Sequence, residues 1–213
     1  MTGRGFLAGV LAATGGWSCA PPPGGPPGDG PVPVRDASAA IVPAGFGSLR
    51  QDELAIRLQP SGLVVRAIPL HESLIRLLTP DSYRTLHDLR ASNELALGDI
   101  SRRLGGRPVE PWLVSFHGVE PEVRFSPLDL IITSAGRDFR ALDVVALSAG
   151  FGEQRLRQRE TQTAILVFEA EVDLQQPLTV WFMTERSDHW EQMLPRIERE
   201  RALVRARASR SEP

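Results

Sequence analysis

Lysine is absent from this chain, and all 24 basic residues are arginine. This absence excludes every mechanism that needs a lysine amine, including Schiff-base formation, a lysine general base and the phosphate-binding lysine of a P-loop. The formal net charge is only −2. Charge therefore gives no indication of binding to nucleic acid or to an anionic membrane surface.

Cysteine is almost absent as well, because Cys19 is the only one. A lone thiol forms no internal disulfide, so the fold must be held by its core, unless Cys19 pairs with another chain. Cys19 follows a basic start at Arg4 and an apolar stretch over residues 6–17. A membrane-spanning helix needs roughly 20 apolar residues. The shorter stretch is typical of a secretory signal peptide.

The tetrapeptide Gly16-Trp17-Ser18-Cys19 resembles the lipobox of bacterial lipoproteins, although Gly16 stands where leucine is usual. The resemblance implies that the Cys19 thiol is acylated, with palmitate among the lipids, and that the protein is anchored to a membrane of the bacterial cell envelope. Because Ala20 is not aspartate, the outer membrane is favoured in a diderm host. Export after ordinary signal-peptidase cleavage near Ala20 is the alternative.

Composition divides the chain into four parts. Residues 1–19 form the lipoprotein-type signal peptide, and residues 20–45 are so rich in proline and glycine that we expect a disordered tether. Residues 46–186 form a domain of ordinary size, with a helical insertion over residues 70–105. Residues 187–213 form a C-terminal helix and tail. A tether after a lipid anchor would hold the domain away from the bilayer.

Along the domain, the spacing of apolar residues changes between a period of two residues, typical of strands, and a period of 3.6 residues, typical of helices. Apolar residues at every second position predict short strands, and the turn signals between them favour an antiparallel β-sandwich. Helical spacing predicts two helices in the insertion, the second starting at Thr79-Pro80-Asp81 and ending at Gly105-Gly106. The predicted strands cover residues 54–58, 63–68, 112–117, 128–133, 141–147, 163–172 and 178–183, and the predicted helices cover 70–78 and 80–104.

Four segments between residues 125 and 180 resemble bacterial extracytoplasmic immunoglobulin-like domains. They are Phe125-Ser126-Pro127, Gly136-Arg137-Asp138-Phe139, Ala164-Ile165-Leu166-Val167-Phe168 and Leu178-Thr179-Val180. The resemblance implies an immunoglobulin-like β-sandwich with a binding or assembly role, and it supplies no catalytic residues.

The C-terminal stretch is predicted to be helical, with Ser187 as a possible cap. Trp190 begins an apolar stripe that continues through Met193, Leu194 and Ile197. Pro195 removes a helical hydrogen bond, so the helix either kinks there or begins there. Trp190 lies at the edge of this helix, and with Tyr83 it is our candidate for a partner surface.

No catalytic, cofactor-binding or metal-binding set emerges from the motifs. The four histidines are His71, His87, His117 and His189, and they lack HExxH spacing. There is no GxSxG elbow and no phosphate-binding glycine motif. The carboxylates show no pairing of the kind that a glycosidase needs.

These observations predict a membrane-tethered, non-enzymatic binding or assembly lipoprotein of the bacterial cell envelope. Its expected partners are the membrane, through the lipid anchor, and another envelope protein. The insertion over residues 70–105 would supply specificity, since insertions give a scaffold its own surface. The alternative is an envelope hydrolase or carbohydrate-active enzyme with a site built from distant acids and His71 or His117. Convergent polar groups in a deep cleft beside the helical insertion would favour that alternative, and a flat, closed surface there would remove it.

Overall fold

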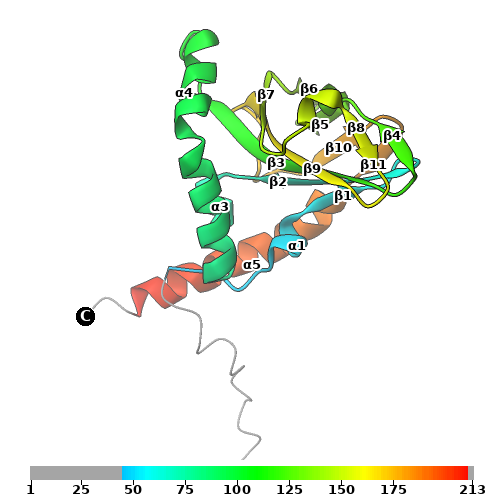
Figure 1. Cartoon of the computed structure of the whole chain (residues 1–213). Coiled ribbons are helices and arrows are strands. Elements are labelled where there is room, and N and C mark those ends of the chain that lie inside the picture. The colour runs from blue at the N-terminus through cyan, green and yellow to red at the C-terminus, as the bar shows by residue number, and fades with distance from the viewer. Residues whose placement is uncertain (1–44, 211–213) are drawn as a thin grey trace, which may run out of the picture. The chain divides into compact units, whose positions relative to one another are not determined.

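The structure is a computed structural model that describes residues 45–210. The predicted signal peptide, the Cys19 lipidation site and almost all of the tether lie outside these residues. The described part is mainly β, with antiparallel sheets, several helices and a long C-terminal helix, as the sequence predicted (Figure 1).

The larger sheet has five strands in the order β1-β2-β3-β9-β7, and every neighbouring pair is antiparallel. Its centre is β3, which pairs with β2 on one side and β9 on the other. β2 and β3 follow the predicted alternation over much of their length, whereas residues 164–168 of β9 are buried on both faces. The strands are β1 (Ile56–Leu58), β2 (Leu63–Pro69), β3 (Val109–Gly118), β7 (Asp143–Ala146) and β9 (Thr161–Glu169).

A second antiparallel sheet has four strands in the order β11-β10-β5-β6, and β4 and β8 form a separate pair. The two larger sheets share a core, in which the ring centroids of Phe116 on β3 and Phe182 on β10 lie 5.7 Å apart. The strands are β4 (Glu122–Arg124), β5 (Leu130–Ser134), β6 (Arg137–Arg140), β8 (Arg155–Arg157), β10 (Leu178–Phe182) and β11 (Glu185–Ser187). Short 3-10 turns, η2 (Pro127–Asp129) and η3 (Phe151–Glu153), precede β5 and β8.

The predicted helical insertion lies between β2 and β3, but it holds three helices. They are α2 (Glu72–Ile75), α3 (Pro80–Ser92) and α4 (Glu94–Arg103). The predicted helix over 70–78 was too long, and the one over 80–104 is interrupted at Asn93, whose side-chain amide donates to the carbonyl of Leu89 at 2.8 Å. This local bond competes with helix continuation. In Figure 1, α3 and α4 nevertheless follow one another along one side of the strands.

The C-terminal helix α5 (His189–Ser209) begins before Pro195 and continues through it. Its N-cap residue is Asp188, not the predicted Ser187. Trp190, Met193 and Ile197 are buried in the core, and Figure 1 shows α5 running beside α1 (Gln51–Leu54) and β1. Leu54, the last residue of α1, was predicted to begin a strand. The signal for the helix is its acidic first turn, which contains Asp52 and Glu53.

Glu200 joins α5 to the first described residues. Its carboxylate accepts a hydrogen bond from the backbone N–H of Ser48 at 2.8 Å and another from Arg207 at 2.8 Å. Arg207 also donates to the carbonyl of Phe46 at 2.8 Å. The C-terminal helix is thus an integral part of the folded domain. Between residues 45 and 210, no helix is both long and apolar enough to span a bilayer.

Candidate functional site

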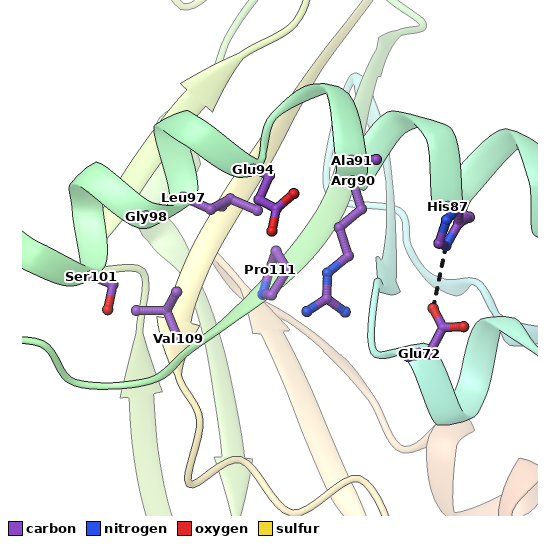
Figure 2. A pocket seen from close by; sticks show the side chains of 10 residues that line it. All are labelled: Glu72, His87, Arg90, Ala91, Glu94, Leu97, Gly98, Ser101, Val109 and Pro111. Atoms are coloured by element: carbon purple, nitrogen blue, oxygen red, sulfur yellow. Dashed lines mark ion pairs between the residues drawn. The ribbon is translucent and has the colours of Figure 1, made fainter.

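A cleft of about 460 Å³ lies between the helices α3 and α4 and the first residues of β3. Figure 2 shows that side chains from α2, α3, α4 and β3 converge on it. Its apolar part includes Leu97, Val109 and Pro111, and its polar part includes Glu72 and Arg90. A concave surface with apolar lining and a few polar groups is the usual form of a ligand site.

Helix geometry explains how these side chains come to one face. The residues from α3 and α4 are spaced by three or four positions, which places them on one side of a helix. The interruption at Asn93 leaves this face continuous (Figure 2). The residues are His87, Arg90, Ala91, Glu94, Leu97, Gly98 and Ser101. On β3 the cleft takes Val109 and Pro111, on either side of Glu110.

Glu72 occupies one end of the cleft and is held by three partners. Its carboxylate accepts from Arg76 Nε at 2.7 Å and from Tyr83 Oη at 2.9 Å, and it pairs with His87 Nδ1 at 3.5 Å (Figure 2). Burial alone would raise the pKa of Glu72, but these hydrogen bonds outweigh burial and hold its pKa below the ordinary value. Glu72 is therefore a weak base.

Tyr83, one of the two predicted surface residues, forms part of this network. Its ring packs edge-on against Phe46 and stacks on His87, with a centroid distance of 5.2 Å in both cases. Partial burial and the hydrogen bond to Glu72 raise the pKa of the Tyr83 hydroxyl. Tyr83 stays a candidate contact residue beside the cleft.

Trp190, the other predicted surface residue, is fully buried. Together with Met193 and Ile197 it forms the core face of α5, so its side chain offers no external surface. Trp112 on β3 is fully buried as well. Trp181 is only partly buried, and Arg186 lies over its ring.

Arg90 was not singled out by the sequence analysis, although it lies near the centre of the cleft. Its guanidinium donates to the carbonyl of Leu70 at 2.8 Å. Figure 2 shows Arg90 and Glu94 reaching from the helices toward Pro111. The polar stripe at helical spacing on α3 and α4 was the available signal, but such stripes usually face solvent.

The histidines lie apart from one another. His87 lies in the cleft, whereas Ser101 is at its opposite end, so the two form no nucleophile and base pair (Figure 2). His117 lies near the end of β3 and bonds the Thr161 hydroxyl at 2.8 Å, and His189 begins α5. Over residues 45–210, no three His, Cys, Asp or Glu side chains are arranged to hold a metal ion.

A second pocket, of about 310 Å³, contains His71 together with Glu110, Glu171 and Asp173. The alternative hypothesis of an enzyme predicted a site built from distant acids and a histidine, and this pocket brings such residues together around His71. Glu110 was not one of the acids that the sequence suggested. No protein-family model, curated protein or solved structure matches the chain. The assignment of a function therefore rests on these two pockets and on the sequence.

Proposed function

We propose that this protein is a membrane-tethered, non-enzymatic binding or assembly lipoprotein of the bacterial cell envelope. The observation that carries the proposal over the enzymatic alternative is the state of the cleft between the helical insertion and β3. It has an apolar lining and a charged margin, but Glu72 is already bonded to Arg76 and Tyr83, and His87 and Ser101 lie at opposite ends (Figure 2). Here the helices inserted between β2 and β3 meet the sheet, so a general scaffold gains a surface of its own.

The chemistry of the cleft favours an extended peptide segment of a partner protein. Leu97, Val109 and Pro111 provide a place for an apolar side chain. Glu94 and Arg90 provide one negative and one positive group beside it (Figure 2). An apolar anchor flanked by polar contacts is the usual arrangement at protein interfaces.

The state of Glu72 supports binding rather than catalysis. A general base needs a pKa near the working pH and a free lone pair directed at its substrate. Glu72 has a lowered pKa and already accepts hydrogen bonds from Arg76 and Tyr83. This carboxylate serves to fix α2 against α3.

The scaffold is proposed to be an immunoglobulin-like sandwich. The support is that two antiparallel sheets pack through one aromatic cluster, in which Phe116, Phe125 and Phe182 take part. The membrane anchor is proposed to be an acyl group on Cys19, on the strength of the lipobox resemblance. Globomycin treatment, followed by mass spectrometry of the mature N-terminus, tests the anchor. An unmodified N-terminus at Ala20 or beyond would refute it.

Gly98 allows a direct test of the cleft. It lines the cleft, and nothing lies within 4 Å of a Cβ built on it. Gly98→Trp would therefore fill the cleft without disturbing the core, and Gly98→Ala is the matched control. We expect mild cross-linking in membranes, followed by detergent pull-down, to recover a partner with the wild type and Gly98→Ala and to lose it with Gly98→Trp. Equal recovery with all three would contradict the assignment of the cleft.

A further inference from the structure

Glu110 is a carboxylate in a row of core residues. Along β3, the side chains of Glu110, Trp112, Val114 and Phe116 alternate onto the same face, and all four are buried. The exposed fraction of Glu110 is only 6%, and its strand partner is Phe168. Every other member of the row is apolar, so the fold alone gives no reason for an acid here.

The Glu110 carboxylate is also incompletely bonded. Its Oε1 is buried and has no hydrogen-bond partner among residues 45–210. A buried acceptor without a donor costs free energy, and a buried charge costs more. The charge of Arg90 offsets part of the effect of burial on Glu110, but the hydrogen bond of the Arg90 guanidinium goes to the Leu70 carbonyl.

Glu110 lines the pocket of about 310 Å³ together with groups from three other parts of the chain. His71 and Ser73 come from the start of α2, Glu171 and Asp173 from the loop after β9, and Arg201 from α5. Glu110 is thus one of the groups that form the wall of this pocket, while its Oε1 is shielded from solvent.

The pocket has an excess of negative charge. Three carboxylates line it, and the only arginine among its lining residues, Arg201, is already paired with Glu198 at 2.5 Å. His71 adds no positive charge at neutral pH, since burial and the charges of Arg90 and Arg201 lower its pKa. Its Nδ1 lies 2.8 Å from the Ser73 hydroxyl and 3.3 Å from the Ser73 backbone nitrogen.

We propose that this pocket binds a protonated amine or guanidinium group, with Glu110 as the buried anchor and Glu171 and Asp173 at its acidic margin. After a small shift of the pocket wall that uncovers Oε1, an N–H of the ligand would supply the donor that this oxygen lacks. The paired charges would lie in a poorly solvated site, where such hydrogen bonds are strong. The protein has already met the cost of burying the carboxylate during folding, so the site is preorganised. A metal ion is a weaker candidate, because the described residues offer no set of three ligating groups.

The ionisation of Glu110 supports this assignment and makes it testable. Burial raises the pKa of Glu110 to about 7, and the charge of Arg90 offsets part of that rise. The ionised fraction then grows from about one tenth at pH 6 to about nine tenths at pH 8. Burial and the charges of Arg90 and Arg201 lower the pKa of His71, the other group of this pocket whose pKa is shifted. We therefore expect affinity for a cation to rise about tenfold between pH 6 and pH 8.

The test is calorimetric titration of the full-length chain in detergent with two cations. Agmatine stands for a free small ligand, and N-acetyl-arginine methylamide stands for an arginine side chain of a peptide. The corresponding citrulline amide is the neutral control of similar shape. We expect at least one cation to bind, the citrulline compound to bind at least tenfold more weakly, and the tighter cation to identify the source of the group.

Glu110→Gln keeps the shape of the side chain and removes its charge, and Glu191→Gln is the matched control because Glu191 is exposed on α5 and lines neither pocket. We expect Glu110→Gln to lose at least tenfold in affinity and its pH dependence, and Glu191→Gln to bind as the wild type does. The proposal is overturned if no cation binds at millimolar concentration, if the citrulline compound binds equally well, or if Glu110→Gln binds unchanged. Circular dichroism of each variant verifies that the fold is retained.

Discussion

Glu72 and Glu110 are both glutamates, and each lines a pocket that includes residues from the start of β3. Their carboxylates differ in burial and in hydrogen bonding. Glu72 accepts hydrogen bonds from Arg76 and Tyr83, and its pKa is lowered. Glu110 has a buried oxygen without a partner, and burial raises its pKa to about 7. A carboxylate that is fully bonded within the protein stabilises the fold. One that is buried and left open costs stability and is available to a ligand.

The largest expected effect is the pH dependence of stability that Glu110 creates. Its folded pKa lies above its unfolded value, so the folded state holds more protons between pH 4.5 and pH 7. Its contribution to the free energy of unfolding is therefore full at low pH and is lost as pH rises through this window. The expected loss is about 3 kcal/mol. Urea unfolding of the wild type and Glu110→Gln at pH 4.5, 6 and 8 measures it as the difference between the two chains.

Glu72 should behave with the opposite sign. Because its folded pKa is lowered, its contribution is present above its ordinary pKa and is lost as pH falls through the folded value. The two carboxylates thus act in different pH ranges, which separates their effects. A constant difference between the wild type and Glu110→Gln over pH 4.5–8 would contradict the assigned state of Glu110.

A smaller effect is expected when the Glu72 network is weakened. Glu72→Gln removes the charge from its hydrogen bonds to Arg76 and Tyr83, and the network is partly exposed to solvent. The expected loss is about 1 kcal/mol at pH 7. Tyr83 is the only tyrosine in the chain, so its hydroxyl is titrated directly by ultraviolet absorbance. We expect its raised pKa to fall toward the ordinary value in Glu72→Gln. An unchanged Tyr83 pKa would show that burial alone sets it.

The regular part of the fold was predictable because burial imposes a period. β2, β3, β9 and β10 each have a buried face, and alternation revealed all four. The strands β4, β8 and β11 have three residues each and contain at most one apolar residue, so they show no alternation. Trp190 had a signal that was misread. Its spacing to Met193 and Ile197 is that of one helical face, and that face is the core.

Glu110 was missed because Val109-Glu110-Pro111 reads as a loop before a strand. Proline removes a ladder hydrogen bond and is unusual in a central strand. In the structure, the Leu70 N–H donates to the carbonyl of Pro111 just beyond the end of β2. The nitrogen and the carbonyl of Pro111 both point toward the β2 side of β3. Because β2 ends at Pro69, no β2 residue there requires the N–H that proline lacks. β3 therefore extends back through Pro111 and carries Glu110 into the core, which only the tertiary arrangement shows.

The smallest effect should come from Tyr83→Phe, which removes one donor from Glu72 and leaves the aromatic packing in place. The ring still contacts Phe46 and His87, so the expected loss of stability is about 0.5–1 kcal/mol. Because Arg76 still donates to Glu72, the pKa of Glu72 should move only part of the way back to its ordinary value. Carboxyl carbon NMR titration measures this shift, and Glu110 in the same spectrum is the internal control. A change in the Glu110 pKa as well would show that the two carboxylates are coupled. Glu72 and Glu110 would then belong to one shared network, and they would not be a hydrogen-bonded and an unpaired acid that act independently.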